Sequence, residues 1–427
     1  MKQRIAFYTF GCRLNQAETA IMHQSFAEKN YKIVDYRNNA DVVVVNTCTV
    51  TENGDADTWR FVNKINRINP KAKIALVGCQ AQVQREKLME LPGVNWVVGN
   101  EKKMNFVDIF ENSGFDTPQL ITPSISKKSF TIPVAGIDKN HARVNLKIQD
   151  GCDFFCSFCE IPFARGRARS REFDDIKKEA KQLVKAGHKE LVITGINVGT
   201  YHYSGRNFLD VLTVLEEIDN LERIRISSIE PTTIPVSLFT KIAAQGKICR
   251  YLHIPIQSGS DEILLTMKRK YTVAQFSEFL LMAEKIVNDV CLGTDVIVGF
   301  PGETNEYFEE TVNLLQELPF AYFHVFSYSN RDHAKSSKYF NKVSAEDIRF
   351  RSSVLRELSG KKRNFFLQKF IGKELKVLFE QKKNGFWTGV TDNYIRVKVE
   401  SDLDLKNRIL PVKLDRIENQ AMIGILE

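Results

Sequence analysis

A cysteine follows closely after each of three predicted strands in the first 80 residues of the chain. The strands and their cysteines are 5–9 with Cys12, 41–46 with Cys48, and 73–77 with Cys79. Unbroken apolar runs such as 42–45 are typical of strands that are buried on both faces of a parallel sheet. Ligands bind beyond the carboxyl ends of parallel strands, so the repeated position predicts that the three thiols share one site. The alternative is three unrelated buried residues, a common environment for free cysteine.

Helical spacing between these strands completes an α/β pattern. The expected helices are residues 16–28, 58–68 and 80–89. Strands that alternate with helices predict a doubly wound parallel α/β domain over residues 1–115. Three prolines and Gly136 then interrupt the periodicity, so residues 116–140 are predicted to be a linker.

The alternation of strands and helices resumes over residues 141–360. The expected strands are 143–149, 190–194, 223–227, 251–255, 294–298 and 322–326, and helical stretches lie between them at 174–186, 208–219, 273–287 and 306–318. Six such units predict a partial (β/α)6 barrel whose functional loops follow the carboxyl ends of its strands.

From residue 374 onward the chain changes to a period of two, which is typical of β-strands. The expected strands are 374–380, 385–390, 394–399, 409–414 and 421–426, after a basic helical stretch at 346–371. Residues 361–427 carry 14 Lys and Arg against 9 Asp and Glu. A small, basic, all-β barrel is the prediction, similar to barrels that bind RNA or single strands.

The bulk properties are compatible with a multidomain protein of the cytoplasm. The chain has 427 residues, of which 43% are hydrophobic, and a formal net charge of +8. No apolar run approaches the roughly 20 residues that span a bilayer, and the N-terminus begins as a strand without a secretory apolar region. In the cytoplasm the eight cysteines are expected to be reduced, which favours metal binding or catalysis over disulfides. Cys249 and Cys291 have no partner pattern and are expected in the core.

The run 151–159 places Cys152, Cys156 and Cys159 within eight residues, directly after the first predicted strand of the barrel. Closed zinc sites use four ligands, and no Cys or His follows within the next twenty residues. The spacing therefore favours an iron–sulfur cluster with one iron left open over zinc. An open iron is a place where a small molecule can bind and react.

Residues 150–159 resemble the cluster loop of radical S-adenosylmethionine enzymes, and further runs resemble the methylthiotransferase family within that superfamily. These runs are 11–18, 46–51, 77–81, 165–167, 227–231, 253–260 and 295–303. The resemblance covers nearly the whole chain, since the C-terminal barrel resembles the TRAM domain. It implies two [4Fe–4S] clusters, held by the two cysteine trios, with S-adenosylmethionine as methyl donor and radical source.

The resemblance also implies cofactor-binding residues at the barrel mouth. They are Phe158, Gly195, Asn197, Glu230, Gln257 and Ile297. For each of these the alternative is ordinary packing or a turn. An alternating basic run lies beside the cluster loop and consists of Arg165, Arg167 and Arg169 together with Arg171. They are candidates for contacts with the cofactor carboxylate or RNA phosphates, unless the run is a solvated basic loop.

The first motifs most resemble the subgroup that converts N6-threonylcarbamoyladenosine at position 37 of tRNA to its 2-methylthio derivative. The implied partners are a tRNA anticodon stem-loop and an electron donor such as flavodoxin or ferredoxin, with no membrane. The alternatives are isopentenyladenosine in tRNA, a ribosomal protein as substrate, or an RNA-binding protein with structural clusters. Two features depart from the family pattern: Glu160 replaces an apolar residue, and 328–335 replaces a segment that contains Pro-Gly-Thr.

Overall fold

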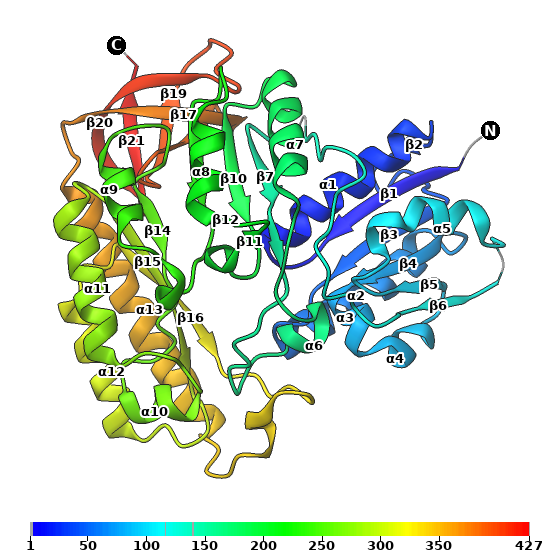
Figure 1. The fold of residues 1–427 in the computed structure, drawn as a ribbon, viewed down its shortest axis with the longest axis horizontal. Coiled ribbons are helices and arrows are strands. Elements are labelled where there is room, and N and C mark those ends of the chain that lie inside the picture. The colour runs from blue at the N-terminus through cyan, green and yellow to red at the C-terminus, as the bar shows by residue number, and fades with distance from the viewer. Residues whose placement is uncertain (1–2, 116, 139–140, 427) are drawn as a thin grey trace.

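The computed structural model describes residues 3–115, 117–138 and 141–426, which form an N-terminal α/β domain, a partial barrel and a C-terminal β-barrel (Figure 1). The N-terminal sheet is entirely parallel, with the order β2-β1-β3-β4-β5-β6. Its elements are β1 (Arg4–Thr9), α1 (Arg13–Glu28), β2 (Lys32–Ile33), β3 (Val42–Thr47), α2 (Glu52–Ile68), β4 (Lys73–Gly78), α3 (Cys79–Val83), α4 (Arg85–Met89), β5 (Val94–Val98), α5 (Phe106–Asn112) and β6 (Gln119–Ile121).

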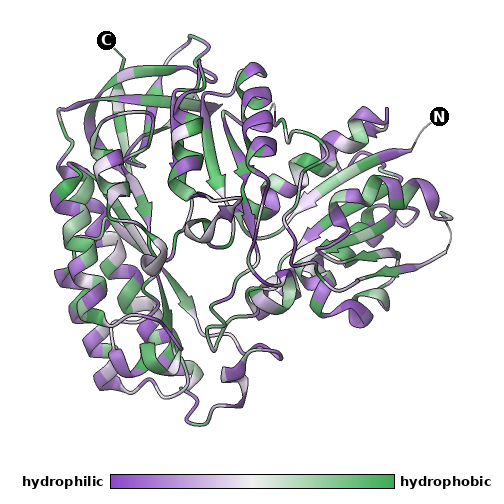
Figure 2. Cartoon of the chain, in the orientation of Figure 1, coloured by the Kyte–Doolittle hydropathy of each residue, from purple (hydrophilic) through white to green (hydrophobic). Residues whose placement is uncertain are grey.

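Helices cover both faces of this sheet, which confirms the doubly wound prediction. Alternate residues of β3 point to opposite faces, so Val43 packs with Phe61 of α2 while Val44 packs with Phe26 of α1. Trp96 of β5 is fully buried on the α1 side. The strands are the apolar layer in Figure 2, and the helices carry the polar outer faces.

Two expectations for this region were wrong in detail. The predicted helix 80–89 is two helices, α3 and α4, because Gln84 leaves helical geometry and donates its side-chain N–H to Asp55 at 2.8 Å. The predicted linker 116–140 supplies β6, which pairs with β5 and extends the sheet, while residues 116, 139 and 140 lie outside the described residues. A strand of only three residues has too little periodicity to stand out in the sequence.

The middle of the chain forms the six expected parallel strands in two groups of three, β13-β10-β7 and β14-β15-β16, joined by a bridge between Ser228 and His253. The partial barrel is therefore confirmed. Its strands are β7 (Arg143–Lys147), β10 (Glu190–Thr194), β13 (Arg223–Ile226), β14 (Tyr251–His253), β15 (Cys291–Val298) and β16 (Tyr322–Ser327). The helices are α6 (Ile161–Arg165), α7 (Phe173–Lys185), α8 (Phe208–Glu216), α9 (Ser237–Ala243), α10 (Asp261–Thr266), α11 (Val273–Ile286) and α12 (Asn305–Glu317), and short strand pairs are β8 (Gln149–Asp150) with β9 (Arg169–Ser170) and β11 (His202–Tyr203) with β12 (Arg206–Asn207).

A long helix, α13 (Ala345–Gln368), runs beside β16 and leads into the C-terminal barrel (Figure 1). The predicted domain boundary at residue 361 lies inside this helix, since its periodicity continues across the boundary without a break. The closed five-stranded barrel is confirmed, in the order β17-β18-β19-β21-β20. Its strands are β17 (Glu374–Lys383), β18 (Phe386–Thr391), β19 (Arg396–Glu400), β20 (Ile409–Glu418) and β21 (Ala421–Ile425).

The C-terminal barrel docks at the amino-terminal end of the partial barrel, where Tyr394 also accepts from Arg13, the residue after Cys12, at 3.3 Å. Arg223 and Arg225, at the start of β13, donate to the carbonyls of Val390 at 3.0 Å and Thr391 at 3.0 Å. Cys249 and Cys291 are buried there, as expected for core residues. None of the helices in the described part of the chain has both the length and the apolar character that a bilayer-crossing helix needs.

Candidate functional site

The three N-terminal cysteines meet at one edge of the sheet. Cys12 precedes α1, Cys48 follows β3 and Cys79 is the first residue of α3. Burial raises the pKa of the Cys48 thiol to about 12, and the neighbouring sulfurs of Cys79 and Cys12 add to the shift. A thiol responds in this way only to groups that lie close by. Because β1 and β3 are adjacent in a sheet of order 2-1-3-4-5, the site lies at the topological switch point.

Gly11 lets two of these cysteines approach one another. Its φ is +91°, and a Cβ at this position would lie 2.8 Å from both Cβ and Sγ of Cys48. Any other residue would combine backbone strain with this overlap. The glycine before Cys12 is therefore part of the thiol site.

The second trio is carried by the loop between β8 and α6. Burial raises the pKa of Cys152 to about 11, with Cys156 nearby adding to the shift. Gly151, at φ +72°, opens the loop, and a Cβ there would lie 2.0 Å from the carbonyl oxygen of Arg167. The centre of the loop is fixed through Ser157, whose N–H donates to the Met267 carbonyl at 3.0 Å.

Both trios fit the ligand set of a [4Fe–4S] cluster. Among the described residues no three His, Cys, Asp or Glu side chains converge as ligands of one metal ion would. In a four-iron cluster each thiolate binds a different iron, so the ligands surround the cluster and need not converge on one point. Two sets of three thiols can hold two clusters, each with one iron free of a protein ligand.

Arg269 connects the second trio to the barrel interior, and sequence reasoning missed it. Its guanidinium donates to Cys156 Sγ at 3.2 Å and to Glu230 Oε1 at 2.5 Å. Burial raises the pKa of Glu230 above its ordinary value, and the guanidinium offsets part of this effect. In the sequence Arg269 stands between Lys268 and Lys270, so it has the signature of an ordinary basic turn.

The predicted cofactor-binding residues fall into neighbouring pairs around the barrel mouth. Asn197 lies just beyond Gly195, and its carboxamide oxygen accepts from Thr233, which also donates to the carbonyl of Glu230. The Gln257 carbonyl accepts from the N–H of Ile297 at 2.9 Å.

Phe158 packs in the same cluster as Ile297, together with Met267 and Phe300. Asn197 Nδ2 is buried and has no partner among the described residues, so it is a free donor in this region. The contacts of these side chains with a nucleoside stay a prediction.

Two of the three candidate arginines do not lie where RNA could reach them. Arg165 is fully buried and donates to Glu18 at 3.0 and 2.9 Å and to Asp150 at 2.9 Å. Arg169 is also largely buried and pairs with Glu101 at 2.9 Å. The prediction that these two side chains bind substrate was therefore wrong, because carboxylates of the folded chain already occupy them. Arg167 is half exposed.

Arg165 belongs to a buried ionic network between the N-terminal domain and the partial barrel. Glu18 of α1 also accepts from Lys103 at 2.5 Å and Lys147 at 2.7 Å. Burial alone would raise the pKa of Glu18, but Arg165, Lys103 and Lys147 outweigh it and hold the pKa well below its usual range. Arg165 reaches the first trio as well, through Asn15, whose amide donates to the carbonyl of Thr47 at 3.0 Å. This network fixes the two trios relative to one another.

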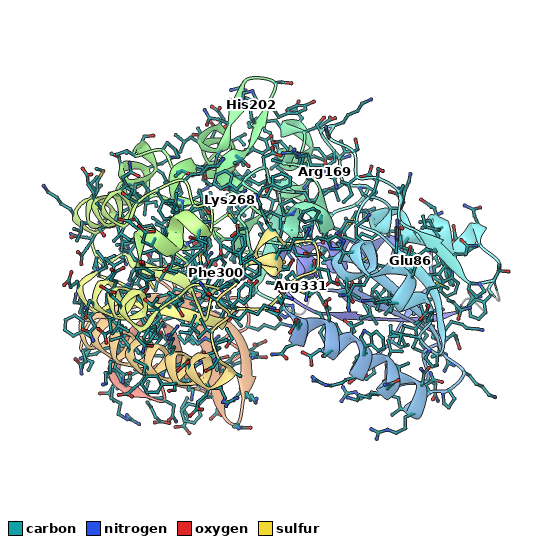
Figure 3. All side chains as sticks on the ribbon, turned by 90° about the horizontal axis from the view of Figure 1, so that it is seen from below. Glu86, Arg169, His202, Lys268, Phe300 and Arg331 are labelled. Atoms are coloured by element: carbon teal, nitrogen blue, oxygen red, sulfur yellow. The ribbon has the colours of Figure 1, made fainter. Side chains whose placement is uncertain are left out.

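The two parts of the chain that depart from the family pattern, Glu160 and residues 328–335, contact each other. Glu160 is buried directly after Cys159, and its Oε1 is in hydrogen-bond contact with Nδ1 of His333. Arg331 of the same segment donates to Thr49 Oγ1 and Asp55 Oδ2, both at 2.6 Å. Figure 3 shows Arg331 where the two halves of the molecule meet. No sequence motif indicated these contacts, since the partners are 173 residues or more apart.

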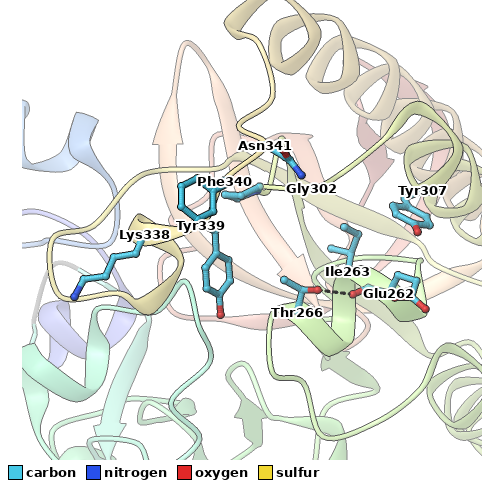
Figure 4. Close-up of a pocket in the computed structure, with 10 residues that line it drawn as sticks. Glu262, Ile263, Thr266, Gly302, Tyr307, Lys338, Tyr339, Phe340 and Asn341 are labelled. Atoms are coloured by element: carbon cyan, nitrogen blue, oxygen red, sulfur yellow. Dashed lines mark hydrogen bonds between the residues drawn. The ribbon is translucent and has the colours of Figure 1, made fainter.

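An open hollow of about 390 Å³ lies beside α10 (Figure 4). Its lining residues are Glu262, Ile263, Thr266, Pro301, Gly302, Tyr307, Lys338, Tyr339, Phe340 and Asn341. The Thr266 carbonyl accepts from Ser157 Oγ at 2.9 Å, so the end of α10 separates the hollow from the cysteines. None of the predicted cofactor-binding residues lines it.

Comparisons with known proteins give two family matches and relatives of nearly full length. Residues 4–99 match the uncharacterized protein family UPF0004, and residues 146–315 match the radical SAM superfamily. The threonylcarbamoyladenosine tRNA methylthiotransferase MtaB of Bacillus subtilis is 36% identical, covering 96% of this chain and 93% of the relative. The protein of the same name from Aquifex aeolicus is 36% identical, covering 93% of this chain and 97% of the relative.

A third relative carries a different name. The tRNA-2-methylthio-N(6)-dimethylallyladenosine synthase of Thermodesulfovibrio yellowstonii is 31% identical over 99% of both chains. Among solved structures, the radical S-adenosylmethionine methyltransferase TsrM from Kitasatospora setae has a TM-score of 0.55 and 14% identity, covering 77% of this chain and 75% of its own. That likeness supports the fold alone.

Proposed function

The chain belongs to the radical S-adenosylmethionine methylthiotransferase family, and from this premise we propose that it converts N6-threonylcarbamoyladenosine at position 37 of tRNA to its 2-methylthio derivative. Two relatives named for that nucleoside are 36% identical, whereas the relative named for dimethylallyladenosine is 31% identical. The observation that carries a methylthiotransferase reaction is the pair of thiol trios, held in a fixed relation by the buried network around Glu18 and Arg165.

The cofactors of this proposal are two [4Fe–4S] clusters and S-adenosylmethionine, which supply the radical, the sulfur and the methyl group. Cys152, Cys156 and Cys159 would hold the radical-forming cluster. Cys12, Cys48 and Cys79 would hold the cluster that delivers sulfur. Acid–base groups cannot break an unactivated C–H bond, so the cofactors would carry out this step. The protein would bind and orient the cofactors and the substrate.

The chain's own residues have positioning roles in this scheme. Arg269 donates to Cys156 Sγ and so stabilises negative charge on that sulfur, while Glu230 fixes the guanidinium. The free N–H donor of Asn197 would hold a polar group of the nucleoside cofactor, with Gly195, Gln257 and Ile297 nearby. Phe158 packs beside Ile297.

The proposed substrate implies where tRNA would bind, an electron donor and a location in the cell. The anticodon stem-loop would lie between the two trios, with the basic C-terminal barrel on the tRNA backbone, because phosphate contacts supply affinity while the active site reads the base. A flavodoxin or ferredoxin would supply electrons. The proposed location is the cytoplasm, where tRNA is modified.

Mass spectrometry of tRNA nucleosides from a deletion strain tests the assignment. The 2-methylthio derivative of threonylcarbamoyladenosine should disappear, and the unmodified nucleoside should accumulate. Complementation with the wild-type gene should restore the product, and Cys48→Ala or Cys156→Ala should not.

Other outcomes separate the remaining candidates. Loss of the dimethylallyladenosine product instead would identify the function of the 31% relative. Unchanged tRNA together with an altered ribosomal protein would identify a protein substrate. Iron and sulfide without any cleavage of S-adenosylmethionine after reduction would identify structural clusters.

A further inference from the structure

Three aromatic side chains form an exposed row beside the cluster loop: Phe155, Phe163 and His333. We call them the aromatic row. Phe155 is 37% exposed and Phe163 is 43% exposed. The rings of Phe155 and Phe163 meet edge to face at 6.3 Å, and Phe163 stacks on His333 with centroids 5.4 Å apart. Aromatic rings usually lie in a core, so three exposed rings in contact indicate a binding surface.

The aromatic row extends from one thiol trio toward the other. Phe155 directly precedes Cys156 of the second trio. Phe163 directly precedes Ala164, whose carbonyl accepts from Asn100 Nδ2 at 2.6 Å. Asn100 Nδ2 also lies 3.6 Å from Cys79 Sγ of the first trio. The segment 155–164 therefore adjoins residues of both trios.

The His333 end of the aromatic row is anchored from two sides. Glu160, buried behind the ring, is in hydrogen-bond contact with Nδ1 and fixes the orientation of the imidazole. Two residues earlier, Arg331 binds Thr49, the residue after Cys48. The imidazole thus stacks on Phe163, and the His333 side chain is 43% exposed.

Two cationic side chains lie over phenylalanine rings of the cluster loop. The Arg167 guanidinium lies 4.4 Å from the centroid of the Phe155 ring, and Lys270 Nζ lies 4.2 Å from that of the neighbouring Phe154. The acidic groups beside the row include Asp153, which contacts Arg167 at 3.3 Å, the buried Glu160, and the exposed Asp332 directly before His333. Exposed rings interleaved with cations are the surface chemistry that binds single-stranded RNA, through stacking on bases and attraction to phosphates.

We propose that Phe155, Phe163 and His333 are a platform on which a base of the substrate's single-stranded loop stacks, so that the neighbouring base is held between the two thiol trios. This inference rests on the proposed function, because it takes an RNA loop as the substrate. Stacking selects an unpaired base and tolerates differences in its identity. The rings are positioning residues and take no part in the chemistry.

The binding of a fluorescent anticodon stem-loop RNA to the anaerobically reconstituted protein tests the platform. Phe163→Leu keeps apolar bulk but removes the flat ring, so it should weaken binding about tenfold, within the range expected for one base stacked on one ring. Phe163→Trp should restore the affinity. His333→Ala should weaken binding to a similar extent. Phe350→Ala, which removes a 64% exposed ring from α13, is the matched control and should bind like wild type.

Unchanged RNA affinity in both Phe163→Leu and His333→Ala, at normal iron content, would overturn the platform. If Phe163→Leu lowers the iron content, His333→Ala decides alone, because His333 lies in a different segment of the chain, 328–335, that carries no cysteine. The wild-type protein provides the separate test of the proposed function. If it binds the RNA through the aromatic row but yields no methylthio product, the proposed function fails and the platform stands.

Discussion

At the scale of single residues, a few atoms shape the immediate surroundings of each trio. Gly11 leaves space for Cys48, Gly151 leaves space for the Arg167 carbonyl, and Arg269 bonds to Cys156. Two of these residues are glycines, and the third is an arginine in a basic turn. They matter because of the groups that they face in the folded chain: Cys48, the Arg167 carbonyl and Cys156.

Gly11→Ala should impair the first trio. A Cβ would lie 2.8 Å from Cys48 Sγ at a backbone φ of +91°, so the loop must shift at a cost of about 1–3 kcal/mol. The expected results are about half the iron of the wild type after anaerobic reconstitution and a lower midpoint of thermal unfolding. Gly385→Ala also changes a glycine with positive φ, but it meets nothing within 4 Å, so it should keep full iron content.

Arg269→Met should lower the free energy of unfolding by about 3–5 kcal/mol, because it leaves the carboxylate of Glu230 buried without its cation. Denaturant unfolding of the single and double variants measures this. Adding Glu230→Gln should recover part of the loss, since the uncompensated charge is then removed. Strictly additive losses would show that the two side chains do not act as a pair.

At the scale of elements, α1 and α6 connect the two halves of the active site. Arg165 from α6 and Glu18 from α1 are both fully buried and form a bidentate pair. Each helix also adjoins cysteines: α1 begins directly after Cys12, and α6 begins two residues after Cys159. A shift of either helix therefore moves a trio.

Glu18→Gln should destabilise the protein at neutral pH by about 3–5 kcal/mol, because three buried cations lose a shared carboxylate. The folded protein holds the pKa of Glu18 well below the ordinary value of 4.5. Its stabilising contribution is therefore full above pH 4.5 and is lost as the pH falls below that value. Circular dichroism of urea unfolding at pH 7 and at pH 4 measures both effects.

The wild type should lose more stability between these two pH values than Glu18→Gln does. Glu86→Gln changes an exposed carboxylate and should follow the wild type. An equal acid dependence in Glu18→Gln and wild type would contradict the role given to the network.

At the scale of the whole molecule, the three domains have different roles. The N-terminal sheet and the partial barrel each carry one cysteine trio at the carboxyl ends of their strands, and the C-terminal barrel docks at the opposite end of the partial barrel. The exposed aromatic row lies at the second trio.

Cys48→Ala should separate the two halves of the reaction. It removes one ligand of the first trio, so the reconstituted protein should hold about half the iron, while dithionite should still drive cleavage of S-adenosylmethionine. Cys156→Ala should lose a similar amount of iron and all of the cleavage. Constant iron with lost cleavage in Cys48→Ala would contradict the two-site model.

Much of the fold could be predicted, because long apolar runs such as 42–45 and the period of two after residue 374 are local signals. The strands β2 and β6, of two and three residues, are too short to carry such a signal. Within the site, the structure brings the members of each trio together as the spacing predicted. The burial of Arg165 could not be predicted, because an arginine run has no local mark of burial and its partner Glu18 lies 147 residues away.

By itself the sequence determined which thiols belong together and on which strands and loops they stand. Those properties follow from residue spacing and backbone geometry, which act over a few residues. Only the tertiary structure decided that Arg165 is a buried connection between domains, that Arg269 bonds to a cysteine, and that His333 lies over Phe163 beside Glu160. These contacts depend on how whole domains pack, and nothing in a short stretch of chain records which distant side chain will lie opposite.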